Sequence, residues 1–324
     1  MTSRILVLHD TPDELTELLR QRCGDAAIRY ATKPTEVLPA LHEFSPTAVL
    51  SIKHSSFPGA AHRPAAHHPS VRWLHVGGSG YEHLRRWDPA RLTVTHSAGV
   101  LAPFLAETTL AAMLSLAVEL PRFADQQRQR LWTPRRFKAL SGRTLLVIGV
   151  GRVGGEVATR AKALGMNIIG IRSSSARHPA VQQMHGPDDL SVLLPRADVV
   201  SVHARLDAST RGMLGAEQFA QMKPGALLLN SSRGAVLHEG ALIEALTSGQ
   251  VGGAWLDVFA VEPLPRTSPL WSMANVLITP HCADQVVDFP RRFAERFCDL
   301  RDASLAGERL PALSPPPEDH HALQ

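Results

Sequence analysis

The sequence predicts an α/β protein of two domains, each built on a doubly wound parallel sheet with helices on both faces. Three observations support this prediction. The chain has 324 residues and is 44% hydrophobic, which is enough to fill two cores. Short apolar runs alternate with helix-like stretches in both halves of the chain. A glycine-rich turn, GVGRVG at 149–154, stands between an apolar run and a helix-like stretch.

The first series of βα units runs to residue 99. The expected strands are RILVLHD, TAVLSIK, VRWLHVGG and LTVTHSAG, and DELTELLRQR is an expected helix. Residues 102–120 carry strong helix formers and are apolar on more than one face, which predicts a buried helix. A polar, arginine-rich arm containing Trp132 follows it. We expect a domain boundary near this helix.

The second series begins at Thr144. Its expected strands are TLLVIGV, MNIIGI, ADVVSVH, ALLLNSS, GGAWLDVF and NVLITPH, with helix-like segments such as GALIEALTSG between several of them. We therefore expect one domain from residues 1–98 and 281–311, and a second from residues 99–280. Residues 312–324 are proline-rich and polar, which predicts a tail outside any core.

Composition limits the classes of function. No apolar run approaches the roughly 20 residues of a membrane span, and MTSRILVLHD shows no signal peptide, so we expect a cytoplasmic protein without membrane contact. The net charge of +4 comes from scattered arginines, without the basic stripe typical of nucleic-acid binding. Cys23, Cys282 and Cys298 are odd in number and far apart in sequence, which predicts free thiols in a reducing compartment.

Sixteen histidines raise the question of a metal site. His62, His67 and His68 lie close together in HRPAAHHPS, but no Cys, Asp or Glu accompanies them, and two prolines break any helical face. We expect a solvated loop there and no metal ligands.

The turn GVGRVG is typical of a Rossmann-like dinucleotide-binding domain. Gly149 would make the tight turn, Gly151 would let the backbone approach a pyrophosphate, and Gly154 would let the helix pack closely on the strand. Arg152 and Val153 open the helix, whose N-terminal N–H groups favour an anion. A glycine-rich turn without a ligand is the alternative.

The end of the next strand discriminates between the two nicotinamide cofactors. An acidic side chain would hold the ribose of NAD there, but the chain reads IIGIRSSSAR. Arg172 takes the acidic position, and nearby donors suit the 2′-phosphate of NADP; they are Ser173, Ser174, Ser175 and Arg177. We expect NADP(H) to be preferred, with NAD(H) as the alternative cofactor; a surface arginine beside a serine loop is the other interpretation.

Four further segments follow the turn: HARLDASTRGML at 203–214, NSSRGAV at 230–236, GAWLDVFAVEPLP at 253–265 and NVLITPHCAD at 275–284. Together with GVGRVG they resemble the D-isomer specific 2-hydroxyacid dehydrogenase family, in particular its glyoxylate/hydroxypyruvate reductases. The resemblance covers nearly the whole chain, since VRWLHVGGSGYEHL is similar to the family's substrate loop. It implies a flavodoxin-like substrate domain plus an NAD(P)-binding domain, a catalytic cleft where they meet, and a homodimer formed through the helix at 102–120 and the arm after it.

The resemblance implies three catalytic residues: Arg233 binds the substrate carboxylate, His281 is the acid/base, and Glu262 is its acidic partner. Each role also makes chemical sense. Reduction of a 2-oxo acid needs a proton donor near neutral pKa, which a histidine supplies. A carboxylate beside the imidazole fixes its tautomer and raises its pKa. The planar guanidinium of arginine matches a carboxylate bidentately, and lysine would keep the charge but lose this geometry.

The resemblance also places the remaining predicted contacts. Cofactor contacts are expected from His203, Arg205, Ser231 and Asp257, and substrate-carboxylate contacts from the N–H groups of Val76, Gly77 and Gly78. Specificity for the substrate tail is expected from Lys53, His54, Tyr81 and Trp132. Three residues depart from the family pattern: Arg205 replaces a proline and could add a cation for the 2′-phosphate, His96 replaces an asparagine, and Asp284 replaces a small residue. Cys282 is expected to be a small buried filler, with a thiol sensitive to oxidation as the alternative.

The resemblance implies NADPH-dependent reduction of a small 2-oxo acid, such as glyoxylate or hydroxypyruvate, to its D-2-hydroxy acid. The alternatives are an NAD(H)-sensing interaction protein of the corepressor type and a compact phosphoglycerate or phosphite-type dehydrogenase. The phosphite interpretation is weakened because GGSGYEHL lacks the expected lysine.

Overall fold

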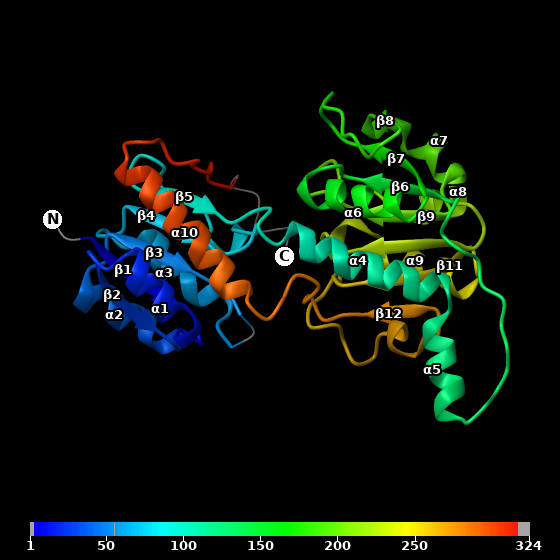
Figure 1. Ribbon diagram of the computed structural model, residues 1–324, viewed down its shortest axis with the longest axis horizontal. Helices are drawn as coiled ribbons and strands as arrows, with labels where there is room; N and C mark the ends of the chain where they lie inside the picture. The colour runs from blue at the N-terminus through cyan, green and yellow to red at the C-terminus, as the bar shows by residue number, and fades with distance from the viewer. Residues whose placement is uncertain (1–2, 55, 317–324) are drawn as a thin grey trace. The chain divides into compact units, whose positions relative to one another are not determined.

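The computed structural model describes residues 3–54 and 56–316, which form two compact units (Figure 1). The chain passes from the first unit to the second at Leu101/Ala102 and returns at Gln285/Val286. The sequence predicts these crossings at 98/99 and 280/281. The segment 281–285, which is expected in the first unit, instead belongs to the second.

The first unit is a parallel sheet of five strands in the order β2-β1-β3-β4-β5. The strands are β1 Arg4–Leu8, β2 Ala27–Ala31, β3 Ala48–Ser51, β4 Trp73–Val76 and β5 Thr93–His96. All four residues of β3 are buried, as expected for a strand covered on both faces. This strand order is that of flavodoxin-like folds, which confirms the predicted fold of this unit.

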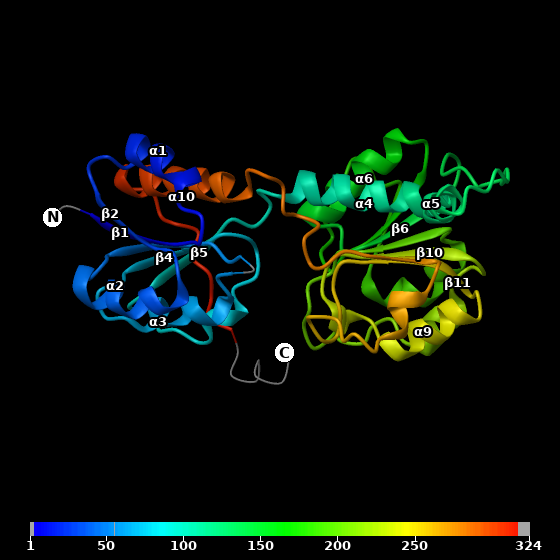
Figure 2. The ribbon, with the colours of Figure 1, turned by 90° about the horizontal axis from the view of Figure 1, so that it is seen from below.

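Four helices cover the two faces of this sheet: α1 Asp13–Arg22, α2 Val37–Phe44, α3 Arg63–His67 and α10 Phe289–Leu305. Figure 2 shows α1 and α10 on one face and α2 and α3 on the other. The apolar side of α10 packs on the sheet, where Phe297 stacks on Trp73 with ring centroids 4.5 Å apart. The helix that returns from the second unit therefore completes the core of the first.

The second unit is a parallel sheet of seven strands in the order β12-β11-β10-β9-β6-β7-β8. The strands are β6 Thr144–Ile148, β7 Asn167–Ile171, β8 Gln183–His185, β9 Val199–Val202, β10 Ala226–Asn230, β11 Val251–Leu256 and β12 Val276–Ile278. The chain reverses its direction of winding between the neighbours β6 and β9. This doubly wound order confirms the predicted Rossmann fold, whose ligand crevice lies at such a switch point, outside the carboxyl ends of the strands.

Helices cover both faces of the second sheet, with α4 and α6 on one face and α9 on the other (Figure 2). The helices are α4 Ala102–Ala117, α5 Leu120–Arg128, α6 Arg152–Ala163, α7 Leu190–Leu193, α8 Ala216–Gln221 and α9 Glu239–Thr247. Two hydrophobic cores result, one on each face of the sheet. Short 3₁₀ turns complete the chain: η1 Pro34–Glu36, η2 Gly59–His62, η3 Glu82–Leu84, η4 Pro187–Asp189, η5 Leu194–Arg196, η6 Gly234–Val236 and η7 Pro269–Ser272.

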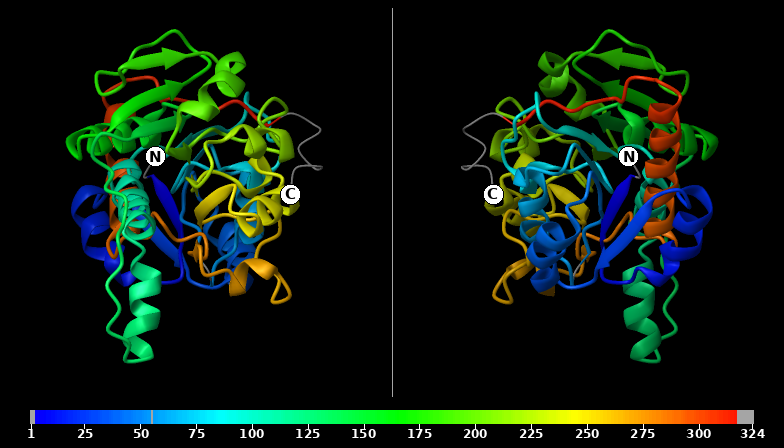
Figure 3. Two further views of the ribbon diagram at one scale, coloured as in Figure 1. Left: turned by 90° about the vertical axis from the view of Figure 1, so that its right-hand side faces the viewer. Right: turned by 90° about the vertical axis from the view of Figure 1, so that its left-hand side faces the viewer.

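The helix predicted over 102–120 ends early, and only one side of it is buried. Glu119 adopts a left-handed conformation with φ +57°, and α5 departs from α4 at an angle of 65°. Within the described residues no single helix is long and apolar enough to cross a membrane, although this bent pair reaches the necessary length and composition together. Helix α5 and the segment after it extend from the second unit as an arm (Figures 1 and 3), on which Trp132 is 98% exposed.

Two other expectations about the first unit are wrong. The predicted solvated loop HRPAAHHPS contains the last residue of η2 and all of α3. Its His62 is fully buried, and its ring nitrogens are satisfied by Ser51 Oγ at 2.9 Å and by the Phe57 carbonyl at 3.2 Å. The predicted C-terminal tail begins inside the unit, since Leu313 packs on the core and its N–H donates to the Val94 carbonyl at 2.8 Å. Residues 317–324 of that tail lie outside the described residues.

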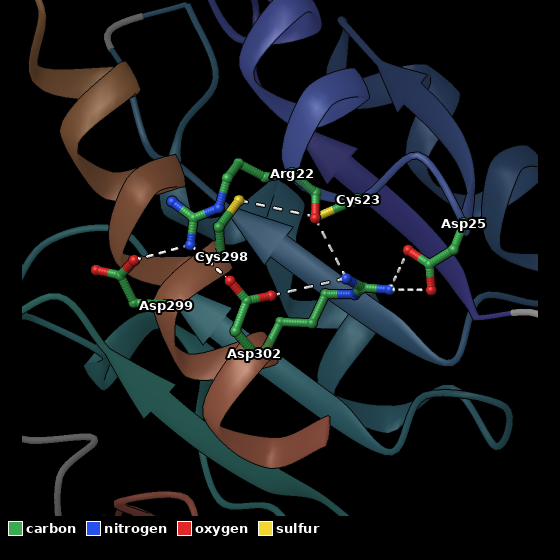
Figure 4. Close-up of polar contacts among 7 residues, drawn as sticks. Arg22, Cys23, Asp25, Cys298, Asp299 and Asp302 are labelled. Carbon is green, nitrogen blue, oxygen red and sulfur yellow. Dashed lines mark hydrogen bonds and ion pairs between the residues drawn. The ribbon is translucent and has the colours of Figure 1, made fainter. Parts of the chain in front are cut away.

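A polar cluster ties α10 to the end of α1 (Figure 4). Arg301 is almost completely buried and donates to both oxygens of Asp25 at 2.5 and 2.6 Å. Beside it the thiols of Cys23 and Cys298 are fully buried, with their sulfurs 3.8 Å apart. All three cysteines are free thiols, as expected, but two that are far apart in sequence lie in contact.

Candidate active site

The glycine turn lies between β6 and α6, where the sequence places it. Gly149 has φ +94°, and a Cβ there would lie 2.6 Å from the Ala204 amide nitrogen. A Cβ on Gly154 would overlap the Gly149 carbonyl oxygen, so helix and turn pack too closely for any side chain. Gly151 instead faces open space, with no atom within 4 Å of a built Cβ. The backbone at Gly151 is therefore accessible, and the first turn of α6 presents N–H groups beside it, which fits a pyrophosphate.

Arg172 directly follows β7. Its backbone N–H donates to His185 O at 3.1 Å, and its side chain is half-buried. Among residues 3–54 and 56–316, no hydrogen bond or ion pair engages this guanidinium. Ser173, Ser174, Ser175 and Arg177 follow as an exposed loop. A cation and hydroxyl donors thus lie where β7 ends, without an acidic residue in the loop itself.

The loop after β9 carries His203 and Arg205. The ring of His203 bonds to Ser201 Oγ at 2.7 Å and lies 3.5 Å from Ser231 Oγ, so it links the ends of β9 and β10. Burial lowers the pKa of His203 to about 4, which keeps it neutral at pH 7. Arg205 is 90% exposed and its Nε lies 3.3 Å from Asp207 Oδ2. This ion pair competes with the predicted contact between Arg205 and a 2′-phosphate.

Arg233 lies in a tightly held loop at the end of β10. Asn230 is fully buried, and its Oδ1 accepts from the N–H and hydroxyl of Ser232 at 3.0 and 2.8 Å. Its Nδ2 donates to the Arg233 carbonyl at 3.2 Å. The next residue, Gly234, lies so close to the following segment that a Cβ would overlap the Phe259 carbonyl and lie 2.5 Å from the Ala260 amide nitrogen. The loop of Arg233 is thereby held against the segment that leads to Glu262.

Glu262 and His281 form a hydrogen-bonded pair. Nδ1 of His281 donates to Oε2 of Glu262 at 2.7 Å, and Oε1 of Glu262 accepts from the Phe259 amide at 3.0 Å. Both oxygens of the carboxylate are therefore engaged, which fixes the imidazole ring and its tautomer. The His281 side chain is still 50% exposed, so the pair faces outward from the core. The sequence prediction that Glu262 is the partner of His281 agrees with this contact.

Charge on this pair favours an imidazolium. The hydrogen bond to Glu262 raises the pKa of His281 above its usual value, against the effect of burial. The pKa of Glu262 lies below its usual value, although burial alone would raise it. The lowering comes from hydrogen bonds donated by His281 and the Phe259 amide, and from the positive charges of His281 and Arg233. The charge of Arg233 lowers the pKa of Glu262 and, to a smaller extent than the Glu262 hydrogen bond raises it, also lowers the pKa of His281. A cation, an imidazolium and a carboxylate converge at this edge of the sheet.

Asp257 holds the turn that carries His281. Its Oδ1 accepts from Thr279 Oγ1 at 2.6 Å and from the amides of Cys282 and Ala283 at 3.0 and 3.2 Å. The His281 amide donates to the Asp257 carbonyl at 2.9 Å, and His281 itself has φ +51°. A non-glycine residue in this region is strained, and the bonds from Asp257 stabilise it. The sequence predicts Asp257 only as a cofactor contact.

Two residues that the sequence singles out follow His281: Cys282, and Asp284, which departs from the family pattern. Burial raises the pKa of Asp284, and burial also raises the pKa of Cys282. The thiol form of Cys282 is therefore favoured, which supports the filler interpretation over a reactive thiolate. Within the described residues no group of three or more His, Cys, Asp or Glu side chains could hold a metal ion.

The predicted substrate loop lies at the carboxyl edge of the first unit's sheet. Val76 ends β4, and the Gly77 amide donates to Ser51 O at 2.8 Å. A Cβ on Gly77 would lie 2.7 Å from Phe293 of α10, and Gly78 has φ +95°. Only glycine suits both positions. Nearby, the ring of Tyr81 contacts Trp87 and His96, with centroids 5.9 and 6.4 Å away.

Sequence reasoning missed Asn230, Gly234 and Thr279. Asn230 could have been found as an amide at the end of a continuous apolar run, ALLLN, where a buried polar group needs partners. Gly234 directly follows the predicted Arg233, but its need for glycine depends on a segment 25 residues further on. Thr279 has no local signal, because its partners come from another strand.

Comparisons with known proteins agree on one family. The family model "D-isomer specific 2-hydroxyacid dehydrogenase, NAD binding domain" matches residues 110–283. A glyoxylate reductase of Korarchaeum cryptofilum is 34% identical over 76% of each chain. A D-3-phosphoglycerate dehydrogenase of Methanocaldococcus jannaschii is 42% identical over 55% of this chain, which spans only 34% of that protein. One similar solved structure is a D-isomer specific 2-hydroxyacid dehydrogenase from Xanthobacter autotrophicus Py2, in complex with NADPH and MES. It superposes with a TM-score of 0.79 and is 29% identical, and the match covers 97% of this chain and 99% of that one.

Proposed function

The chain belongs to the D-isomer specific 2-hydroxyacid dehydrogenases, a family of NAD(P)-dependent oxidoreductases, and from this premise we propose that it reduces a small 2-oxo acid, such as glyoxylate or hydroxypyruvate, to the D-2-hydroxy acid with NADPH. The observation that carries the proposal is the pair of Glu262 and His281, 2.7 Å apart, with the charge of Arg233 acting on both. This arrangement supplies a held proton donor beside a cation for a carboxylate.

His281 is the proton donor in this proposal. The nicotinamide cofactor, when bound, supplies a hydride to the carbonyl carbon of the substrate. Nδ1 of His281 is engaged by Glu262, so its Nε2 is the nitrogen that gives a proton to the developing alkoxide. The rise in the pKa of His281 caused by Glu262 favours the protonated form of this nitrogen.

Arg233 binds and orients the substrate. Its planar guanidinium can donate to both oxygens of the 2-oxo acid's carboxylate, and an N–H near the 2-oxo oxygen would stabilise negative charge as it forms. The hydrogen bonds of Asn230 and the close packing of Gly234 keep the loop from moving, so little ordering cost is left for binding. Contacts of the substrate carboxylate with the N–H groups of Val76, Gly77 and Gly78 stay a prediction.

The preference for NADPH rests on Arg172. Its guanidinium has no partner among the residues that the structure describes and is followed by three exposed serines, which supports binding of a 2′-phosphate. The solved relative from Xanthobacter autotrophicus contains NADPH, which agrees with this proposal. The homodimer through α4, α5 and the arm also stays a prediction, in keeping with the exposed Trp132, Leu131 and Phe137 on that arm.

The proposed function is tested by the loss of nicotinamide absorbance when the protein is mixed with glyoxylate, hydroxypyruvate, pyruvate or phenylpyruvate. We expect turnover, with kcat/KM higher for NADPH than for NADH, and an Arg172→Asp variant in which this preference is reversed. A wild-type protein that uses NADH better would contradict the role of Arg172 alone. Tight cofactor binding without turnover of any acid would replace the enzyme with a nucleotide-sensing protein.

Glu262→Gln is expected to move the pH dependence of reduction to lower pH. Reduction needs protonated His281, so the rate falls as pH rises through the pKa of that group. Glu262 raises this pKa, and a neutral amide at the same place removes the charge, so the fall begins at lower pH. The measurement is kcat/KM against pH for wild type and variant at saturating NADPH. Coincident profiles would show that the Glu262 charge does not act on the proton donor.

A further inference from the structure

The loop after β7 carries the groups proposed to bind the 2′-phosphate, and it is anchored at its two ends. At its start, the Arg172 amide donates to His185 O at 3.1 Å. Residues 173–177 are exposed, and no hydrogen bond or ion pair engages them within the part of the chain that the structure describes. The shape of the loop therefore depends on its anchors, of which the second is the segment 178–181.

The second anchor packs on α6. Ala180 is buried in the core that it shares with this helix. Lys162, near the end of α6, donates from Nζ to the Pro179 carbonyl at 3.1 Å. The ring of His178 lies near the start of the helix, against Gly155. The segment thus contacts α6 at two places that are about two helical turns apart.

Gly155 is the residue that makes room for this ring. It follows the turn GVGRVG and lies inside α6 without a left-handed backbone, so neither the turn nor its own conformation requires glycine. Glycine is also among the poorest helix formers. A Cβ at this position, however, would lie 2.7 Å from Nε2 of His178 and 3.1 Å from its Cδ2, which is closer than van der Waals contact allows. The imidazole therefore occupies the place of a side chain at position 155.

A hydrogen bond to the backbone fixes the orientation of the ring. Nδ1 of His178 accepts from the Ala180 amide at 3.3 Å, so a neutral ring carries its proton on Nε2. The opposite edge of the ring, Nε2 and Cδ2, is the part that packs on Gly155. One side of the imidazole is thus bonded to the end of the loop and the other side contacts the helix. His178 thereby connects the loop to α6.

We propose that His178, packed on Gly155, is a positioning residue that holds the loop 172–177 in the shape that receives the 2′-phosphate of NADPH, and this inference rests on the cofactor preference proposed above. A phosphate bound by Arg172 and the serines after it needs these donors to converge. A loop without hydrogen bonds of its own loses conformational entropy on such binding unless its ends are held. The pyrophosphate, which both cofactors share, is expected at the glycine turn, outside this loop. His178 therefore acts on the group that distinguishes NADPH from NADH.

A double-mutant cycle tests this contact. Nicotinamide fluorescence gives the dissociation constants of NADPH and NADH for wild type, His178→Ala, Gly155→Ala and the double variant. We expect His178→Ala to raise the constant for NADPH by about tenfold, and Gly155→Ala, which displaces the ring, to raise it by at least about threefold. The constant for NADH should change by less than about twofold. In the double variant the new methyl group meets no ring, so Gly155→Ala should add little to the effect of His178→Ala.

Gly186→Ala is the matched control. Gly186 lies in the same unit with φ −83°, and a Cβ there would have no atom within 4 Å, so both dissociation constants should stay unchanged.

The outcomes separate this inference from the function on which it rests. A ratio of the two constants that is the same in His178→Ala as in wild type overturns the inference, while the preference for NADPH stands. Additive effects in the double variant overturn it as well, because the two residues would then act separately. A wild type that binds NADH as tightly as NADPH overturns the preference and this inference with it. Turnover of 2-oxo acids tests the reductase function separately, because these binding measurements need no substrate.

Discussion

His281→Asn is expected to lower kcat/KM for reduction of a 2-oxo acid by about 10²- to 10⁴-fold, which is the usual contribution of a positioned general acid. The asparagine amide can keep the hydrogen bond to Glu262 Oε2, which His281 now makes at 2.7 Å, so the loop geometry is preserved. Its N–H groups are far too weakly acidic to give a proton to the alkoxide. The effect should therefore lie mainly in kcat, with a small change in KM.

The control for this variant is cofactor affinity. His281 is not among the residues predicted to bind NADPH, so the dissociation constant measured by nicotinamide fluorescence should match that of wild type. Equal affinity with a large loss of rate assigns His281 to the proton transfer. A rate within a few-fold of wild type would exclude His281 as the proton donor and would leave Glu262 without a partner of known role.

Much of the fold was predictable because its strands are buried on both faces. Short apolar runs such as ALLL at 226–229, bounded by turn residues, are typical of central strands of a covered parallel sheet, and the turn at 149–154 marks where the second sheet begins. The contact of Glu262 with His281 was also predictable, since the family motifs place both residues. These features depend on local sequence or on a recognisable ordered set of segments.

Other features were not predictable because their causes lie far away in the sequence. The break between α4 and α5 is the exception, because it is local: Glu119 adopts a left-handed conformation two residues before Pro121, which lies in the first turn of α5. The burial of His62 depends on bonds from Ser51 and Phe57. The contact of Cys23 with Cys298 requires α10 to return across the first sheet. The role of Asp257 in the His281 turn likewise appears only when β11 and β12 are paired.

The close packing at Gly234 leads to the second large expected effect. A methyl group in Gly234→Ala would overlap the Phe259 carbonyl, and these backbone atoms cannot rotate away as the end of a flexible side chain could. The Arg233 loop and the segment before Glu262 must therefore separate by an appreciable fraction of an ångström or more. A displacement of about 1 Å in a catalytic group can cost about a hundredfold in rate, so we expect kcat/KM to fall by about that factor. Overpacking should also cost about 1–3 kcal/mol in the free energy of unfolding.

Gly240→Ala is the matched control, because the two glycines are six positions apart and differ in their surroundings. Gly240 lies in the first turn of α9, exposed, and a Cβ there would come no closer than 3.6 Å to His238. Alanine favours a helix, so this variant should keep full activity and gain up to about 1 kcal/mol in stability. The assay is kcat/KM together with chemical unfolding of both variants. Full activity in Gly234→Ala would mean that the Arg233 loop can move without loss of function, and the explanation of catalysis by a rigid loop would then be wrong.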